Sequence, residues 1–211
     1  MEYGLYVITD QIAATGRSHA HIAQKCMKNG ADVLQLRDKT LSKEELLTAA
    51  KEVHDITAGS RMALIVCDDL EAALSSGAEG LHIYESDLDV SEVRSKCPDG
   101  FVIGVSVSDL DSAVEAEDKG ADYIIWGPLF PSYLEDLGEL KELEELRSLR
   151  EAVSIPIVAI GGIKLFNVSE TLAAGADGVA VKTGALHQRD IGEAVDLLAK
   201  AVSSQKRTGG H

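Results

Sequence analysis

Asn29-Gly30-Ala31-Asp32 is the first of four closely similar stretches in this chain. The others are Ser76-Gly77-Ala78-Glu79, Lys119-Gly120-Ala121-Asp122 and Ala174-Gly175-Ala176-Asp177. Each stretch follows an amphipathic segment and precedes a short apolar run. Glycine at the end of a helix adopts the left-handed conformation at little cost, and the small Ala and the acidic residue then lead the chain into a strand. Four copies, each separated from the next by about two strand–helix units, therefore predict a repeated βα architecture.

Eight short apolar runs, bounded by Gly, Asp or Pro, predict buried strands. They are Gly4–Thr9, Val33–Arg37, Ala63–Cys67, Gly80–Ile83, Val102–Val107, Tyr123–Gly127, Ile157–Ile160 and Gly178–Val181. Helical patterns lie between them, most clearly at Lys43–Ile56, Asp111–Lys119 and Asp190–Val202. Strands that alternate with helices form parallel βαβ units, and about 26 residues per unit is close to the minimum for a closed barrel.

The predicted fold class is α/β, a single (β/α)8 TIM barrel of the phosphate-binding type over residues 1–203. A doubly wound open sheet is the alternative. Pro128–Glu139 is expected to be a long loop on the catalytic face, followed by a solvated outer helix over Glu139–Glu151. Residues 204–211 are polar and Gly-rich and are expected to form a disordered tail.

Composition excludes several classes of protein. The chain is 45% hydrophobic but only 4% aromatic, which predicts a core of Val, Ile, Leu and Ala. A formal net charge of −15 disfavours binding to nucleic acid or to an anionic membrane surface. Three widely spaced cysteines suit a reducing compartment, and we expect neither a signal peptide nor a membrane-spanning segment. These features predict a cytoplasmic protein; a homo-oligomer is compatible with them.

Residues at the carboxyl ends of barrel strands face the functional site. Alternation along the second strand places Gln35 and Arg37 on the same side, and Lys39 follows directly. A guanidinium and an ammonium at the end of a buried strand suit a phosphate or pyrophosphate. The alternative is ordinary surface charge, with Arg37 paired to a nearby carboxylate.

Two aspartates follow the third and fourth strands. Asp68 and Asp87 could converge, and two carboxylates with phosphate oxygens and waters form a magnesium site. The alternative is N-capping of the following helix, and Asp69 fits a cap as well as Asp68 does. His82 is expected to be a hydrogen-bonded core residue and Cys67 a small buried one, whereas His19 and His21 are expected to be exposed.

The loops after the last two strands carry the most specific signal from position alone. Gly161 and Gly162 would let backbone N–H groups approach an anion, and Lys182-Thr183 begins the loop that usually completes the phosphate site of this fold. The alternative is a pair of plain turns.

In this order the motifs resemble those of thiamine phosphate synthase and its relatives in the TenI thiazole tautomerase family. The resemblance covers nearly the whole chain. It rests on the segments Leu5–Asp10, Gln35–Lys39, Ile65–Asp69, Gly80–Asp87, Gly104–Ser108, Asp122–Pro131 and Ala159–Ile163.

The resemblance implies a magnesium-dependent transferase that joins hydroxymethylpyrimidine pyrophosphate to thiazole phosphate and releases pyrophosphate. It assigns the magnesium ion to Asp68 and Asp87 and the pyrophosphate to Arg37 and Lys39, which with Ser106 would be catalytic. The pyrimidine would be positioned by Gln35 and Ser106, and Cys67 would also be a substrate-binding residue. The thiazole phosphate would lie against Gly161, Gly162, Lys182 and Thr183.

The chain departs from the family pattern in several places. Ser132-Tyr133-Leu134-Glu135-Asp136 stands where the family usually has Thr-Ser-Thr-Lys, so a pyrophosphate-binding lysine is missing. Cys67 replaces the usual Asn, and Tyr84-Glu85 replaces Gly-Gln. Lys182-Thr183 replaces Ile-Ser and could restore one cation.

These departures keep two other functions open. One is a non-catalytic or altered-substrate binder of a phosphorylated ligand. The other is a TenI-like tautomerase, although Val107-Ser108 stands where that branch carries its catalytic histidine.

Overall fold

The computed structural model describes residues 1–84, 88–132 and 137–208, without the side chains of 206–208. Its eight strands pair in chain order, all parallel, into a closed barrel. They are β1 Leu5–Ile8, β2 Val33–Leu36, β3 Ala63–Cys67, β4 Gly80–Ile83, β5 Val102–Val107, β6 Tyr123–Trp126, β7 Ile157–Ile160 and β8 Gly178–Val181. Leu5 pairs with Val179 where β1 meets β8 and closes the barrel. The predicted (β/α)8 TIM barrel is confirmed.

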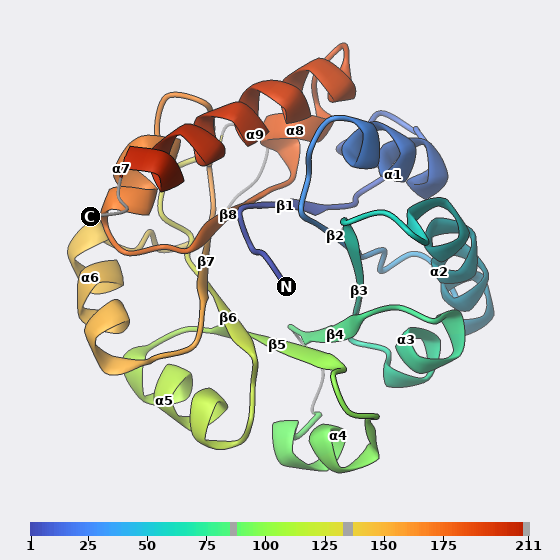
Figure 1. Ribbon diagram of the computed structural model, residues 1–211, viewed down its shortest axis with the longest axis horizontal. Helices are drawn as coiled ribbons and strands as arrows, with labels where there is room; N and C mark the ends of the chain where they lie inside the picture. Colours follow the sequence, from blue (N-terminus) through green and yellow to red (C-terminus); the bar gives the residue numbers. More distant parts are fainter. Residues whose placement is uncertain (85–87, 133–136, 209–211) are drawn as a thin grey trace.

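The helices form a ring around the strands, and the N-terminus lies near the middle of the ring in this view (Figure 1). They are α1 His19–Lys28, α2 Lys43–Thr57, α3 Leu70–Ser76, α4 Val90–Lys96, α5 Leu110–Asp118, α6 Leu143–Ala152, α7 Val168–Ala173, α8 Thr183–Leu186 and α9 Ile191–Thr208. Helices α1 to α7 each connect two consecutive parallel strands, and α8 and α9 follow the last strand. Because all the strands are parallel, their carboxyl ends open onto the same face.

Two apolar layers hold the barrel. Side chains such as Leu34 and Leu64 point outward and pack between the strands and the helices. The inward-pointing side chains form a second cluster: Tyr3, Tyr6, Ile8, Val33, Ile65, Tyr123, Ile125, Val158 and Ala180. The outer cluster is mostly aliphatic, as expected, but the inner one combines three tyrosines with six aliphatic side chains. Glycine makes the room: a Cβ at Gly104 would lie 2.0 Å from the Tyr123 ring.

The four Gly-Ala-acid turns are confirmed as helix ends, and all four glycines have positive φ: Gly30, Gly77, Gly120 and Gly175. Their acidic residues do more than lead into the next strand. The Asp32 carboxylate accepts a hydrogen bond from the Leu5 amide at 2.9 Å. Equivalent hydrogen bonds are donated by the Leu64 amide to Glu79, by the Ile103 amide to Asp122 and by the Ile157 amide to Asp177. Each turn therefore ties the beginning of an even-numbered strand to the beginning of the strand before it.

Two helices differ from the sequence-based expectation. Helix α6 begins at Leu143 instead of Glu139, because Glu142 and Glu145 form a capping box and the Lys141 amide bonds instead to the Pro128 carbonyl at 2.7 Å. Helix α9 continues to Thr208, within the segment 204–211 expected to be disordered. Residues 203–208 contain neither Gly nor Pro, so nothing in their sequence ends the helix before Gly209.

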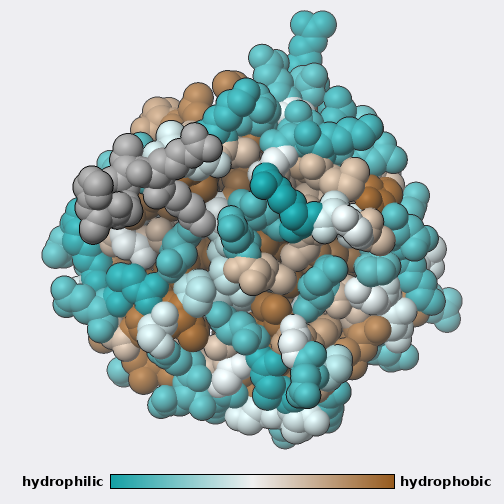
Figure 2. Space-filling model, in the orientation of Figure 1, coloured by the Kyte–Doolittle hydropathy of each residue, from teal (hydrophilic) through white to brown (hydrophobic). Residues whose placement is uncertain are grey.

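Hydrophilic residues dominate the periphery of the molecular face seen in Figure 2, as expected where helices present their polar sides to water. Among the residues that the structure describes, no helix has the length and apolar character required to cross a bilayer.

Candidate functional site

A cavity of about 610 Å³ opens at the carboxyl ends of the strands. It brings together most of the predicted site residues: Gln35, Arg37, Ser106, Gly161, Gly162, Lys182 and Thr183. A neighbouring cavity of about 560 Å³ is lined by Thr9, Asp10 and Lys39 and shares Arg37 and Lys182 with the first. Residues from all parts of the sequence therefore meet at one mouth of the barrel.

The segment after β2 presents two cations. The Thr9 hydroxyl at the end of β1 accepts a hydrogen bond from the Arg37 amide at 3.0 Å. The Arg37 guanidinium lies 4.2 Å from the centre of the Tyr84 ring, and the Lys39 ammonium lies 5.8 Å from the same centre. A ring face attracts cations and limits their motion. Sequence reasoning treated Tyr84 only as a departure from the family, whereas it lies beside both predicted pyrophosphate ligands.

The two neighbouring aspartates after β3 have different roles. Asp69 caps helix α3, since its carboxylate accepts a hydrogen bond from the Ala72 amide at 2.8 Å. Asp68 instead has a φ of +57°, and its carboxylate accepts a hydrogen bond from the Tyr84 amide at 2.7 Å. The capping alternative therefore applies to Asp69, which leaves the Asp68 carboxylate at the end of the barrel.

Cys67 is the last residue of β3. Its side chain is buried, and Sγ is 3.5 Å from the Asp68 carboxylate. Burial, and then the Asp68 charge, raise the pKa of this thiol to about 12, so it stays protonated at neutral pH. Gln35 is also buried, and its Oε1 has no hydrogen-bond partner among the described residues. That oxygen can accept a hydrogen bond from a ligand.

A chain of hydrogen bonds crosses the barrel interior and ends at the cavity. The hydroxyls of Tyr6 and Tyr123 are 2.8 Å apart, and Tyr123 is 3.2 Å from His82 Nδ1. His82 Nε2 is 2.9 Å from the Ser106 hydroxyl. Burial lowers the pKa of His82 to about 3, so the imidazole is neutral. His82 is thus a hydrogen-bonded core residue, as expected, and it also orients a hydroxyl that faces the ligand site.

The glycine loop after β7 is tightly packed. Gly162 has a φ of +57°, and a Cβ there would lie 2.3 Å from the Phe130 carbonyl oxygen. The buried Asn167 side chain donates a hydrogen bond to the Gly162 carbonyl at 3.1 Å. Helix α8 begins at Thr183, and its first N–H groups have no partner within the helix. This arrangement suits an oxyanion such as a phosphate.

The comparisons with known proteins agree with this geometry. The family described as thiamine monophosphate synthase matches residues 5–185. A thiamine-phosphate synthase of Methanoculleus marisnigri is 42% identical over 210 residues, 99% of this chain and 100% of that protein. Another, from Methanocella arvoryzae, is 44% identical over 211 residues, 100% of this chain and 99% of that protein. The chain belongs to the thiamine monophosphate synthase family. The resemblance inferred from the sequence is thereby confirmed.

Solved structures agree with the family assignment. A thiamine phosphate pyrophosphorylase from Pyrococcus furiosus superimposes with a TM-score of 0.87 at 33% identity, over 96% of each chain. A 3-hexulose-6-phosphate synthase superimposes with a TM-score of 0.71 at 18% identity, a likeness that concerns the fold alone. Membership of the thiamine monophosphate synthase family identifies the chain as a transferase of thiamine biosynthesis.

Some predicted features of the family site lie outside the described residues. Asp87 is one, and residues 133–136 of the substituted loop are the other. Within the described ranges, no three His, Cys, Asp or Glu side chains group closely enough to hold a metal ion.

The expectation for His19 was wrong. Its side chain is 4% exposed, and Nε2 lies 3.1 Å from the Asp38 carboxylate. His21 is exposed, as predicted. The sequence does not reveal which of the two histidines, His19 or His21, is buried, because that depends on how α1 packs.

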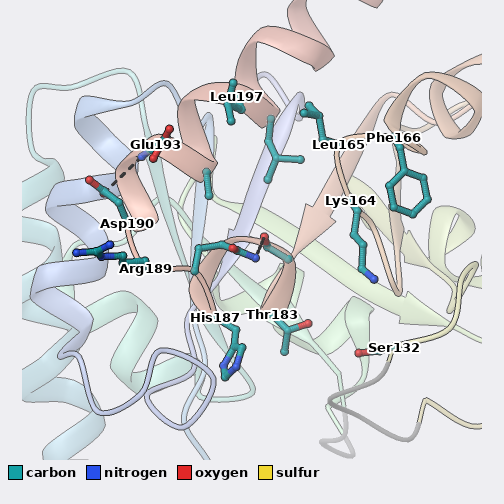
Figure 3. Close-up of a pocket in the computed structure, with 14 residues that line it drawn as sticks. Ser132, Lys164, Leu165, Phe166, Thr183, His187, Arg189, Asp190, Glu193 and Leu197 are labelled. Atoms are coloured by element: carbon teal, nitrogen blue, oxygen red, sulfur yellow. Dashed lines mark hydrogen bonds between the residues drawn. The ribbon is translucent and has the colours of Figure 1, made fainter.

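A further cavity of about 530 Å³ lies between α9 and the segment before α7. Leu165 and Leu197 line one side of it, and Thr183 and His187 the other (Figure 3). Thr183 and Gly184 line both this cavity and the cavity of about 610 Å³ at the carboxyl ends of the strands, hereafter the mouth cavity. The beginning of α8 is therefore the wall between them.

Proposed function

We propose that this chain is a thiamine phosphate synthase that joins hydroxymethylpyrimidine pyrophosphate to thiazole phosphate. The supporting observation is that the residues proposed for the two substrates line one cavity. Arg37, Gln35 and Ser106 line one part of it, and the Gly161–Gly162 and Lys182–Thr183 loops line another. Two different ligands can therefore meet inside one enclosure.

In this reaction the bond between the pyrimidine methylene carbon and the pyrophosphate oxygen breaks, and the oxygen keeps the electron pair. The methylene carbon then bonds to the thiazole nitrogen. Since no protein nucleophile is required, the side chains act by neutralising the leaving group and by positioning the two rings. Arg37 and Lys39 would hold the pyrophosphate, with Tyr84 limiting the directions that both cations adopt.

The heterocycles would be positioned by the buried polar groups. The Gln35 carbonyl oxygen would accept a hydrogen bond from the amino group of the pyrimidine, while Ser106, held by His82, would contact the ring. The backbone of Gly161 and Gly162 would bind the thiazole phosphate together with Lys182, whose ammonium lies 3.5 Å from Asp10.

The family implies a magnesium ion, and the donor groups present fit one. Mg²⁺ takes one or two protein carboxylates and fills the remaining positions with phosphate oxygens and water. Asp68 would supply a carboxylate that does not cap a helix and is held by the Tyr84 amide; Asp87 would supply the second. When bound, the ion would neutralise charge on the departing pyrophosphate.

Two lysines support activity despite the substituted loop. Lys141 and Lys182 both line the mouth cavity, so cations remain there although the usual loop lysine is missing. We further expect a cytoplasmic enzyme whose partners are the two phosphorylated heterocycles, with neither nucleic acid nor membrane, given the charge of −15 and the three free cysteines.

The test is an assay of thiamine phosphate formation from the two substrates and Mg²⁺, with adjacent aspartates as a matched pair. We expect Asp68→Asn to reduce kcat/KM by about 100-fold or more, because a metal ligand is lost. Asp69→Asn should keep the activity and lose at most about 1 kcal/mol of stability. Folded wild-type protein that makes no product would contradict the proposal and favour a binder of a phosphorylated ligand.

A further inference from the structure

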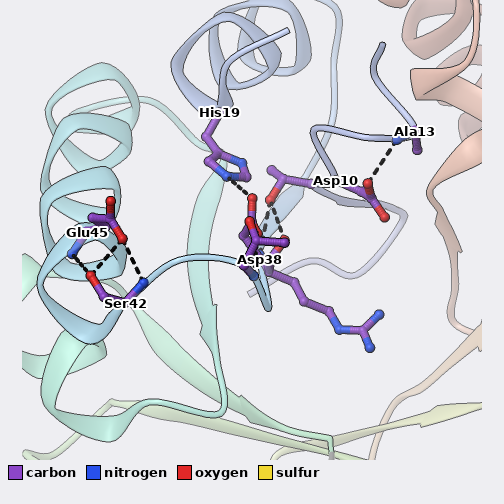
Figure 4. Close-up of polar contacts among 9 residues, drawn as sticks. Asp10, Ala13, His19, Asp38, Ser42 and Glu45 are labelled. Atoms are coloured by element: carbon purple, nitrogen blue, oxygen red, sulfur yellow. Dashed lines mark hydrogen bonds and ion pairs between the residues drawn. The ribbon is translucent and has the colours of Figure 1, made fainter. Parts of the chain in front are cut away.

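The pair formed by His19 and Asp38 lies directly beside the two cations assigned to the pyrophosphate. Asp38 stands between Arg37 and Lys39 in the sequence, and its side chain is 8% exposed. His19 is the first residue of α1, on a different βα unit. In Figure 4 the His19 ring and the Asp38 carboxylate point toward one another.

Both carboxylate oxygens of Asp38 are engaged. Oδ2 is 3.1 Å from His19 Nε2. Oδ1 accepts hydrogen bonds from the Thr40 amide at 2.9 Å and from the Thr40 hydroxyl at 2.6 Å. Burial raises the pKa of Asp38, but the hydrogen bonds from Thr40 and His19 outweigh it and hold the pKa below its ordinary value. The group is therefore a carboxylate and only accepts, so Nε2 carries the proton in this contact.

The segment between β2 and α2 is held at three points. The Arg37 amide is bound by Thr9, and the end of the segment is bound by the capping box of Ser42 and Glu45. His19 supplies the contact between them. Within the described residues, its other ring nitrogen, Nδ1, has no hydrogen-bond partner, so the polar contact of this ring is with Asp38.

We propose that His19 is a positioning residue for pyrophosphate binding, which acts by holding the Asp38 carboxylate against α1. This inference rests on the proposed function. A carboxylate between two cations would compete with the pyrophosphate for them if it were released. Holding Asp38 with His19 and Thr40 directs its charge toward α1 and sets the path of the chain from Arg37 to Lys39. A guanidinium and an ammonium placed in this way need no reorganisation when the ligand arrives.

The first test compares His19→Ala with His21→Ala, because both histidines lie on α1 and only His19 is buried. Loss of a charge-assisted hydrogen bond predicts a KM for the pyrimidine pyrophosphate about tenfold higher in His19→Ala. The KM for thiazole phosphate should not change, and His21→Ala should behave as wild type. His19→Gln, whose amide nitrogen can take the place of Nε2, should restore most of the KM. General loss of packing would instead affect both KM values and would not be rescued by Gln.

The second test asks whether His19 acts through Asp38. In a double-mutant cycle, Asp38→Asn combined with His19→Ala should bind the pyrimidine pyrophosphate better than His19→Ala alone, since a neutral amide no longer competes for the cations. Additive losses would overturn the inference, as would an unchanged KM in His19→Ala.

Calorimetry with inorganic pyrophosphate and Mg²⁺ separates the two proposals. A weaker pyrophosphate affinity in His19→Ala than in His21→Ala would support the positioning role even if the wild-type protein made no thiamine phosphate. Equal affinities in an active enzyme would refute the positioning role and leave the synthase proposal intact.

Discussion

His82 is a neutral imidazole inside the barrel, between the Tyr123 and Ser106 hydroxyls. A neutral ring has one N–H donor and one acceptor nitrogen, so its two partners necessarily receive opposite roles. If Tyr123 donates to Nδ1, then Nε2–H donates to Ser106, and the serine proton is directed away from His82. The pairing of buried hydroxyls thus sets how Ser106 presents itself to a ligand.

This buried ring predicts a pH dependence of stability. The pKa of His82 is about 3 in the folded chain, against 6.5 ordinarily, so below pH 6.5 the unfolded chain binds a proton that the folded chain does not. Stability contributed by His82 is therefore complete above pH 6.5 and decreases as pH falls toward 3. We expect about 2 kcal/mol to be lost at pH 5.

Denaturant unfolding of wild type and His82→Gln at pH 7 and pH 5 measures this contribution. The difference between the two pH values should be smaller in the variant by about 2 kcal/mol. Equal differences in both proteins would show that His82 does not account for the pH dependence of stability.

At the scale of elements, each of the four Gly-Ala-acid turns links two neighbouring strands. Each acidic side chain accepts a hydrogen bond from the first or second amide of the preceding strand, as between Asp32 and Leu5 or between Asp177 and Ile157. A strand begins with an amide that the ladder leaves partly unsatisfied, and the carboxylate satisfies it. The repeat in the sequence is therefore a repeated support at the amino-terminal end of the barrel, opposite the ligand site.

Replacing one of these carboxylates should destabilise the barrel without affecting its chemistry. Asp32→Ala leaves the buried Leu5 amide without its partner, which we expect to cost about 1–3 kcal/mol in urea unfolding. Asp118→Ala, at an exposed position on α5, should change stability by no more than about 0.5 kcal/mol. Catalytic parameters at a temperature where both variants are folded should match wild type; a specific loss of kcat in Asp32→Ala would contradict this assignment.

The loop after β7 can be tested with two glycines that share a positive φ. Gly162→Ala brings a methyl group within 2.3 Å of the Phe130 oxygen, whereas a Cβ at Gly100 has nothing within 4 Å. Gly100→Ala should cost only the conformational strain, about 1 kcal/mol, and keep its activity. Gly162→Ala must move the loop, so we expect the KM for thiazole phosphate to rise about tenfold or more. Similar behaviour of the two variants would argue against a ligand at this loop.

For the molecule as a whole, closure of the barrel depends on the side chains that fill its interior. The Tyr3 ring packs at a tilt against the Tyr123 ring, with ring centres 4.7 Å apart, and both belong to the inner cluster with Tyr6. The N-terminal segment thus covers the end of the barrel remote from the ligand site, near the middle of the strand ring in Figure 1. A buried aromatic side chain is a major contributor to the stability of a core.

Tyr3→Ala should remove about 3 kcal/mol of stability, as expected for a buried aromatic side chain replaced by a methyl group. Tyr3→Phe should retain most of that stability because the ring contacts remain. Met1→Ala is the control, since Met1 is half exposed. Thermal unfolding monitored by circular dichroism distinguishes these outcomes, and a Tyr3→Ala variant as stable as Met1→Ala would mean that Tyr3 does not close the barrel.

The local sequence pattern was sufficient to predict the strands and helices and their order. The eight strands lie within a residue or two of their predicted bounds, and the glycines of the turns adopt the expected left-handed conformation. Gln35, Arg37 and Ser106 are predicted site residues, and they line one cavity because parallel strands all end on one face. These inferences depend on periodicity and on backbone conformation, which neighbouring residues in the sequence control.

Contacts between distant residues could not be read in this way. The sequence does not reveal that Asp32 reaches back to Leu5, that Asp68 accepts a hydrogen bond from the Tyr84 amide, or that His19 is buried against Asp38. Nor does it show that tyrosines lie inside the barrel, because the space for the Tyr123 ring comes from Gly104 on a neighbouring strand. Each of these contacts depends on the distance between segments far apart in the chain, and only closure of the barrel sets that distance.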